Sequence, residues 1–456
     1  MIRILPTLVF FLLFTFGYSE HSRPNILFIL TDDQRWDTLG AAGNPIIQTP
    51  SLDALASEGT HFQNAFVTTP ICAASRASLM TGLYERTHAF TFRTDPLRKE
   101  FVNITYPKLL KDAGYFTGFI GKFGMTYAED LDTSHFDVYS RPGEQFWAVT
   151  YYRLTPDHTG HRHLSENIGD ESLMFLEQAA QTGRPFCLTI SFHAPHAEDV
   201  DPDQFIYPVE LEHLYEEDSI PSAALSDPHF FEEQPEWVKA GLNRIRWKWR
   251  FDTSEKYQSM VKAYYRMITG LDVQIGRVRD RLRELGLDQN TIIIFTSDNG
   301  FFLNERQLAG KWLMYENSLR VPLIVYDPRQ TTPDSLEHMV LNIDIAPTIL
   351  QYAGIPIPDA MQGLPLQSIL NNPEQPLRDS FLCEHLFENP RIPKSEGVRT
   401  EKYKYFRYID HPEHEELYDL ESDPLEQNNL VRDPAYQTIL AQLRKQCDAL
   451  IAGAGQ

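Results

Sequence analysis

The chain has 456 residues, which is enough for one large α/β domain with a smaller companion. Hydrophobic residues make up 42% and charged residues 23% of the chain, a globular composition that excludes a wholly disordered protein. The net charge of −22 argues against a nucleic-acid or anionic-membrane partner, because such partners are bound by basic surfaces.

The first residues have the pattern of an export signal. Arg3 supplies a positive charge, residues 4–16 are almost wholly apolar, and the small residues Gly17 and Ser19 follow. The apolar run is shorter than the roughly 20 residues that a membrane-spanning helix needs. We therefore expect residues 1–19 to be a cleaved signal peptide, and the mature protein to be periplasmic or secreted, with no membrane attachment.

Short apolar runs alternate with helical patterns along most of the chain. Continuous apolar runs of this length are typical of strands that are buried on both faces. The runs lie at residues 25–31, 116–120, 186–192, 291–296 and 322–325, and the helical patterns at 51–58, 75–81 and 256–285. This alternation predicts the α/β class, with a large and mainly parallel sheet covered by helices on both faces.

The last quarter of the chain has a different pattern. A proline-rich segment at residues 355–365 indicates a boundary. Beyond it come alternating segments at 398–408 and 416–420 and a helical pattern at 436–451. We therefore expect one large domain over residues 20–365 and a smaller α+β subdomain, an antiparallel sheet with one helix, over residues 366–456.

Acidic residues follow two of the predicted strands. Asp32 and Asp33 come directly after the first strand, and Asp298-Asn299 comes after the strand at 291–296. The carboxyl ends of parallel strands meet at one edge of a sheet, and clustered carboxylates are costly unless a cation neutralises them. Oxygen ligands favour Ca²⁺ or Mg²⁺. Each aspartate alone could simply cap a helix or turn, but two such strand ends favour a metal site.

Cys72 begins the segment CAASRASLMTG, whose later residues have a helical pattern. The cysteine therefore lies at or just before a helix N-terminus, where the helix dipole favours an anion. From the residues alone, Cys72 is either a thiol of low pKa or a buried residue.

This segment resembles the signature of the sulfatase family. In that signature the cysteine is followed by Pro, Ala or Ser two residues later, by Arg two further on, and finally by Leu-x-Thr-Gly. Other segments match family motifs in the family's order: PNILFILTDDQ from residue 24, Gly121-Lys122, Pro195-His196, SDNG at 297–300, Gly310-Lys311-Trp312, and ELYDL ending at residue 420. The resemblance covers nearly the whole mature chain and implies an alkaline-phosphatase-like fold.

The resemblance also implies the chemistry. In type I sulfatases a maturation enzyme oxidises the signature cysteine to formylglycine, whose hydrate is the nucleophile that attacks the sulfate ester. The family's metal ligands correspond to Asp32, Asp33, Asp298, Asn299 and the modified Cys72, which would hold Ca²⁺ or Mg²⁺. The family's other catalytic positions correspond to Arg76, which braces the formylglycine, and to Lys122, His196 and Lys311, which bind sulfate. His196 would also protonate the departing alcohol.

Two positions depart from the family pattern. Ala74 stands where the commonest signature has Pro, which bears on recognition by the maturation enzyme. Gly124 stands where many sulfatases have a histidine that helps to restore the aldehyde. We expect His88, which follows the signature helix, to replace that histidine, with water or His193 as the alternatives.

Several segments resemble those of bacterial carbohydrate sulfatases, including mucin-desulfating ones, so an O-sulfated carbohydrate is the expected substrate. The segment RIRWKWRF at 244–251 is one of them. Aromatic rings stack on sugars and Arg pairs with acidic groups, which makes Trp247, Trp249 and Arg399 candidates for binding substrate. For the two tryptophans, packing of a helix against the core is the alternative.

Other functions remain open on the same residues. A phosphonate or phosphodiester hydrolase of the same superfamily would share the site, and a metal-dependent phosphatase would keep Cys72 as a free thiol. A non-catalytic relative would bind sulfated glycans without turnover. The signature around Cys72 favours a sulfatase that takes part in the degradation of sulfated polysaccharides.

Overall fold

The computed structural model describes residues 23–92, 94–127, 134–143, 150–154, 161–329 and 334–455. The predicted signal peptide, residues 1–19, lies outside the described residues. Within the described ranges, no helix combines the length and the apolar character that are needed to cross a membrane.

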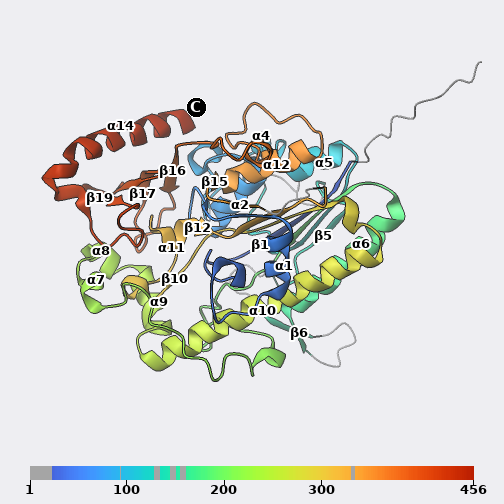
Figure 1. The fold of residues 1–456 in the computed structure, drawn as a ribbon, viewed down its shortest axis with the longest axis horizontal. Coiled ribbons are helices and arrows are strands. Elements are labelled where there is room, and N and C mark those ends of the chain that lie inside the picture. Colours follow the sequence, from blue (N-terminus) through green and yellow to red (C-terminus); the bar gives the residue numbers. More distant parts are fainter. Residues whose placement is uncertain are drawn as a thin grey trace, which may run out of the picture.

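The centre of the protein is an eight-stranded sheet in which most neighbouring strands are parallel (Figure 1). Its strands in spatial order are β14 (Asp334–Leu336), β2 (Thr60–Phe62), β13 (Leu323–Tyr326), β9 (Thr291–Ser297), β1 (Asn25–Thr31), β8 (Phe186–Ser191), β4 (Phe116–Gly121) and β5 (Val138–Ser140). Strand β1 pairs in parallel with β8 and β9, and only β13 runs antiparallel to both of its neighbours. The predicted, mainly parallel α/β sheet is confirmed.

Helices cover both faces of this sheet, which explains why its strands are continuously apolar. Leu27 and Ile29 of β1 enter one core, and Ile26, Phe28 and Leu30 enter the other. On the first face lie α1 (Pro50–Glu58), α6 (Leu164–Thr182) and α10 (Ser254–Glu284). On the second face lie α2 (Cys72–Thr81), α5 (Tyr106–Asp112) and α12 (Ile345–Tyr352).

Shorter elements surround this framework. The short helices are α3 (Glu85–His88), α4 (Lys99–Val102), α7 (Pro228–Glu232), α8 (Glu236–Lys239), α9 (Leu242–Arg250), α11 (Glu316–Leu319) and α13 (Gln367–Asn371). The small sheets are β12 (Arg320–Val321) with β3 (Ala65–Phe66) and β15 (Val340–Leu341), β10 (Phe302–Leu303) with β11 (Ala309–Gly310), and β6 (Tyr152–Leu154) with β7 (His161–His163).

The C-terminal part is a four-stranded antiparallel sheet with one long helix, as predicted. Its elements are β16 (Ser380–His385), β17 (Ser395–Thr400), β18 (Tyr403–Tyr408), β19 (His411–Asp419) and α14 (Gln437–Ala454). The segment predicted as one strand at 398–408 is instead a hairpin formed by β17 and β18. The division at residue 365 stays a prediction.

Helix α2 begins earlier than the sequence pattern indicated. Ile71 is extended, with φ −146° and ψ 130°, and Cys72 is the first helical residue, three positions before the expected start. The helix is buried along its whole length. All four cysteines of the chain, Cys72 included, are buried free thiols.

Candidate active site

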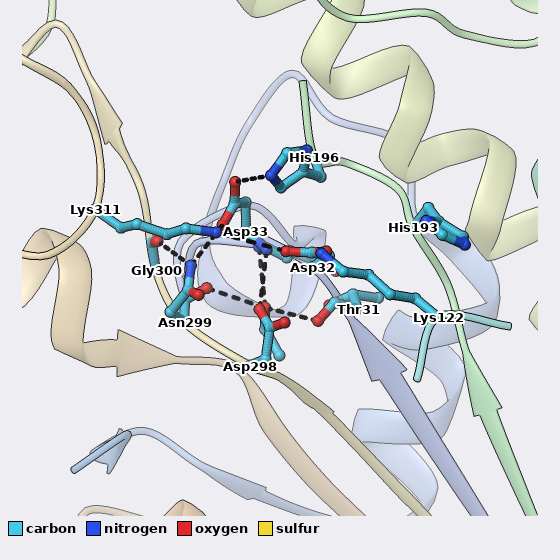
Figure 2. Close-up of polar contacts among 12 residues, drawn as sticks. Thr31, Asp32, Asp33, Lys122, His193, His196, Asp298, Asn299, Gly300 and Lys311 are labelled. Carbon is cyan, nitrogen blue, oxygen red and sulfur yellow. Dashed lines mark hydrogen bonds and ion pairs between the residues drawn. The ribbon is translucent and has the colours of Figure 1, made fainter. Parts of the chain in front are cut away.

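The two acidic strand ends lie side by side at the carboxyl edge of the sheet. Strands β1 and β9 are parallel neighbours with Thr31 opposite Ser297, so the residues that follow them emerge together. The Asp33 amide donates to Asp298 Oδ1 at 3.2 Å, and Asn299 Nδ2 donates to Asp33 Oδ1 at 2.6 Å (Figure 2). We call Asp32, Asp33, Asp298 and Asn299 the acidic centre; all four are at most 1% exposed.

The backbone turns sharply at the acidic centre. Asp33 has a φ of 68°, in the left-handed region that costs a non-glycine residue on the order of 1 kcal/mol or more. The Tyr264 hydroxyl, from α10, donates to the Asp33 carbonyl at 2.6 Å, and the Asp32 amide donates to the Ala194 carbonyl at 3.2 Å. These bonds hold the turn, so that both carboxylates face the same space.

Two lysines from different strand ends reach the acidic centre. Lys122 follows β4 and forms an ion pair with Asp32, whereas Lys311 follows β11 and forms an ion pair with Asp33. Lys311 Nζ also lies 3.7 Å from Asp32 Oδ1. The site therefore holds two ammonium groups that approach it from opposite sides (Figure 2).

Arg76 connects helix α2 with the acidic centre. Its Nε donates to Asp298 Oδ2 at 2.8 Å, and its Nη1 donates to the Lys122 carbonyl and to Ser191 Oγ, both at 2.6 Å. The side chain is 1% exposed. A planar guanidinium is suited to such a role, because its donors point in several fixed directions.

The charges of the acidic centre are incompletely balanced. Burial and the charge of Asp32 raise the pKa of Asp298 to about 6. Burial alone would raise the pKa of Asp32 as well, but Lys122 and the other nearby cations hold it well below its ordinary value. The buried oxygens Asp32 Oδ1 and Asn299 Oδ1 accept no hydrogen bond from the residues that the structure describes.

This donor set fits a hard divalent cation. Carboxylate and amide oxygens are the ligands that Ca²⁺ and Mg²⁺ prefer, and a cation would give both orphaned oxygens a partner. Ligand atoms of Asp32, Asp33 and His196 lie within 4.8 Å of one another, the spacing of a metal site. The structure therefore contains an acidic group suited to holding a metal ion.

Cys72 faces the same space as the cationic side chains. It is 6% exposed and lies one helical turn before Arg76, so both residues are on one side of α2. Burial lowers the pKa of Lys311, but Asp33, Cys72 and Asp32 outweigh this effect and raise it above its ordinary value. Cys72 is thus one of the groups that act on the charge of Lys311, together with the two aspartates.

Two histidines follow strand β8. His196 Nε2 lies 3.8 Å from Asp33 Oδ2, and the Tyr151 hydroxyl donates to the His196 carbonyl at 2.5 Å. His193 lies beside Lys122, on the side of the site away from Lys311 (Figure 2). It is 2% exposed, and among the described residues neither of its ring nitrogens has a hydrogen-bond partner.

Comparison with known proteins decides the family. Residues 24–355, well over half of the chain, match the family model described as sulfatase. The chain belongs to the sulfatase family. Residues 304–453 also match the model described as N-sulphoglucosamine sulphohydrolase, C-terminal.

Named relatives agree with this assignment. The arylsulfatase of Clostridium perfringens is 30% identical over 93% of each chain. The N-acetylglucosamine-6-O-sulfatase of Bacteroides thetaiotaomicron is 28% identical over 92% of this chain and 84% of its own. This sulfatase is therefore a sulfuric ester hydrolase.

Solved structures give the same fold. One protein, solved in complex with its substrate D-glucosamine-2-N,6-O-disulfate, is 25% identical, with a TM-score of 0.72 over 95% of this chain and 98% of its own. The phosphonate monoester hydrolase of Agrobacterium radiobacter is 22% identical, with a TM-score of 0.78 over 95% of this chain and 96% of its own. At that identity the second likeness concerns the fold alone.

His88 does not reach the site of this sulfatase. Its Nε2 lies 3.0 Å from Ser78 Oγ, and its Nδ1 accepts a hydrogen bond from the Phe90 amide at 3.1 Å. Ser78 is six residues after Cys72, about 9 Å further along the helix axis. Because both ring nitrogens are engaged at the far end of α2, the structure does not support His88 as the base that serves residue 72.

Gly124 is required by the local geometry. It has a φ of 69°, and a Cβ atom built there would lie 2.9 Å from Arg76 Cδ. A histidine at this position would strain the backbone and displace Arg76. In this sulfatase the position therefore cannot carry the usual histidine without a rearrangement.

The three predicted substrate-binding residues are dispersed. Trp247 is 9% exposed and donates from Nε1 to Asn304 Oδ1 at 2.6 Å, whereas Trp249 is 41% exposed. Arg399 is 6% exposed and lies over the ring of Phe66 at 4.7 Å. These contacts favour packing roles for Trp247 and Arg399, and none of them leads to the acidic centre.

The structure adds residues that the sequence motifs did not indicate. Ser191 and Tyr264 hold Arg76 and Asp33 in place, and Asp199 and Arg246 form an ion pair beside the site. Asp199 lies three residues after His196, and Arg246 lies in the basic segment at 244–251. The contact with Asp199 comes from an arginine of that segment, and not from either of its tryptophans.

Proposed function

We propose that this protein is a formylglycine-dependent sulfatase that removes O-sulfate groups from a carbohydrate with the help of one divalent cation, Ca²⁺ or Mg²⁺. One observation carries the proposal: the signature cysteine, Cys72, is the first residue of α2 and shares its side of the helix with Arg76. Arg76 in turn is hydrogen-bonded to Asp298 of the acidic centre. In this proposal the nucleophile, the cation ligands and the lysines that would bind sulfate share one space.

The modified residue and the cation would supply what the chain's own side chains lack. A formylglycine hydrate provides a hydroxyl that attacks sulfur, and a bound cation provides positive charge beside it. Asp32, Asp33, Asp298 and Asn299 would hold the cation, together with residue 72. Support comes from the two buried oxygens of the acidic centre that have no partner among the described residues.

The side chains around residue 72 would bind and polarise the sulfate group. Lys122 and Lys311 place two ammonium groups on opposite sides of the acidic centre, and Arg76 holds Asp298 in place. Together they would offset the negative charge that repels a nucleophile and stabilise the charge that develops in the transition state. A local cluster of this kind also overcomes the repulsion expected from a chain with a net charge of −22.

Proton transfer would fall to the two histidines that follow β8. The His196 side chain is 21% exposed and lies at the edge of the acidic centre, where it could protonate the departing alcohol. His193 is buried beside Lys122 with two free ring nitrogens among the described residues, and it replaces His88 as our candidate for the base. His193 therefore lies on the same side of the site as Gly124, the position where many sulfatases have a histidine and this chain does not.

Maturation and export would precede folding. Cys72 is 6% exposed and α2 is buried throughout, so an enzyme that oxidises this cysteine must act on the unfolded chain. A maturation enzyme of the formylglycine-generating type, acting before the chain folds, meets this requirement. Residues 1–19 have the sequence of an export signal, which agrees with a periplasmic or secreted location.

A carbohydrate is the proposed substrate because of the relatives' substrates. Besides the N-acetylglucosamine-6-O-sulfatase, the relatives include an ulvan-active sulfatase of Formosa agariphila, which is 27% identical over 96% of this chain. The structure solved with glucosamine disulfate points to the same class.

The test is the rate of hydrolysis of an aryl sulfate, an aryl phosphonate and an O-sulfated sugar by protein produced together with a maturation enzyme. We expect turnover of the aryl sulfate and the sulfated sugar, and loss of both activities in Cys72→Ala. Faster hydrolysis of the phosphonate than of either sulfate would assign the site to a phosphonate hydrolase instead. Full sulfatase activity in Cys72→Ala would refute the proposed nucleophile.

A further inference from the structure

Helix α9 lies between the two loops that carry Lys311 and His196. Its inward face consists of residues spaced three and four apart: Asn243, Arg246, Trp247 and Arg250. Asn243 Nδ2 donates to the carbonyls of Ala309 and Lys311, at 3.1 and 2.9 Å. The helix is thereby attached to the segment whose lysine enters the acidic centre.

The next turn of α9 reaches the other loop. Arg246 and Arg250 each form an ion pair with Asp199, one to each carboxylate oxygen. Asp199 lies three residues after His196, close enough for its charge and that of His196 to interact. Lys311 and His196 are both neighbours of Asp33, and Arg246 contacts the loops that carry them, through Asp199 on one side and beside Gly310 on the other.

The two arginines have more hydrogen-bond donors than Asp199 can use. Arg246 Nε and Arg250 Nη1 are buried without a hydrogen-bond partner in the described parts of the chain. Burial and the charge of Arg246 lower the pKa of Arg250 to about 10, in spite of the ion pair with Asp199. Two guanidinium groups thus pair with one carboxylate, so Arg246, Arg250 and Asp199 together carry a net positive charge. The Arg246 side chain keeps 11% exposure.

Trp312 connects Arg246 with the neighbourhood of Cys72. The guanidinium of Arg246 lies over the Trp312 ring at 4.7 Å, and the Trp312 amide donates to the Pro70 carbonyl at 3.1 Å. The same ring belongs to a small apolar cluster with Ile71, which precedes Cys72, and Ala74, which lies two residues after it. Trp312 also has a φ of 84°, a conformation that the surrounding contacts must hold.

We propose that Arg246, supported by Arg250 and Asp199, binds a second anionic group on the sugar whose sulfate ester lies at residue 72. The substrate would therefore be a polyanionic glycan unit that carries a carboxylate or another sulfate next to the scissile one. Arginine suits either group, since its planar fork forms paired hydrogen bonds with both. The inference rests on the proposed function, because it concerns the same site.

The test compares substrates that carry one and two negative groups. The measured quantity is the ratio of kcat/KM for a doubly anionic sugar to kcat/KM for a singly sulfated neutral sugar. Two doubly anionic sugars, a glucosamine disulfate and a monosulfated disaccharide with a uronic acid, distinguish sulfate from carboxylate as the recognised group. We expect Arg246→Gln to lower this ratio about 10- to 100-fold for one of them, mainly through KM, as loss of a charged hydrogen bond predicts.

Two further variants separate recognition from structure. Arg246→Lys keeps the charge without the fork and should recover part of the ratio. Arg244→Gln is the matched control on the same helix, because Arg244 donates to Gln307 Oε1 at 2.9 Å and lies over the rings of Phe231 and Trp247. The Arg244→Gln variant should keep the wild-type ratio of the two kcat/KM values. A fall of kcat/KM for all sugars alike in Arg246→Gln, or a wild-type ratio in that variant, would overturn the proposal.

A binding measurement keeps this result separate from the proposed function. Calorimetry with Cys72→Ala protein measures the affinity for the same sugars without turnover. Weaker binding of the doubly anionic sugar when Arg246→Gln is added would support the subsite even if wild-type protein proved to have no sulfatase activity. Equal affinity for the doubly anionic sugar in Cys72→Ala protein with and without Arg246→Gln would refute the subsite. It would leave the sulfatase proposal intact.

Discussion

Replacing Arg76 with alanine tests how the buried charges at the site are held. The variant removes the hydrogen bond to Asp298 Oδ2 and the two bonds that the guanidinium donates to the Lys122 carbonyl and Ser191 Oγ. Asp298 then remains in a position with 0% exposure, without its nearest cation. Water cannot easily replace that partner, because both side chains lie in the interior.

The expected loss of stability follows from burial. Breaking a buried ion pair by removing one partner costs about 3–5 kcal/mol, whereas an exposed pair contributes about 0–1 kcal/mol. A cation bound by Asp298 and its neighbours would offset part of the uncompensated negative charge. Arg76→Ala should therefore lose more stability in chelator than in a buffer that contains Ca²⁺.

Thermal unfolding of wild type, Arg76→Ala and a control variant, each with Ca²⁺ and with chelator, measures this effect. Arg329→Ala is the control, since the Arg329 side chain is 52% exposed and pairs with Asp327 at 2.6 Å. We expect a drop in Tm of several degrees or more for Arg76→Ala in chelator, partly recovered by Ca²⁺, and little change for the control. Equal Tm values for Arg76→Ala and wild type in chelator would show that Arg76 does not stabilise the buried charge of Asp298.

Four further variants test other parts of the site and fold. Asp298→Ala should lose the bound cation and the sulfatase activity together; metal analysis that finds one full equivalent of cation in the variant would contradict this. His193→Ala should slow turnover by about 10²–10⁴-fold while a first burst of alcohol remains, whereas His88→Ala should keep steady-state turnover near wild type; rapid-mixing kinetics compare the two, and the reverse result would restore His88 as the base. Burial and the neighbouring Glu384 raise the pKa of Glu85 from 4.5 to about 8, so the folded state holds a proton that the unfolded state releases, and stability should fall as the pH rises from about 4.5 to about 8. Glu85→Gln should remove that fall in Tm, and an unchanged pH dependence would show that Glu85 is not its source.

Strands and their acidic ends could be predicted because their causes are local. The run from Asn25 to Thr31 is apolar at every position, and β1 is buried on both faces in the structure. Asp32 and Asp33 follow directly, and the parallel pairing with β9 then requires Asp298 to lie beside them. The C-terminal strand β16 was not predicted from the sequence. A glutamate such as Glu384 indicates a surface position, and its burial is explained only by its ion pair with Arg86.

Contacts between distant loops could not be predicted in the same way. Arg246 and Asp199 are 47 residues apart, and nothing in either segment indicates that they meet. His88 was expected near the site because it follows the signature helix closely in sequence. The length of α2 instead carries it to Ser78, away from Cys72.

The proposed mechanism requires residue 72 to act as formylglycine. Peptide mass spectrometry of catalytically active protein, produced together with a maturation enzyme, detects this modification. We expect the peptide that contains residue 72 to carry an aldehyde or its hydrate, and the sulfatase activity of different preparations to rise with the modified fraction. Fully active protein whose Cys72 is an unmodified thiol would exclude a formylglycine nucleophile.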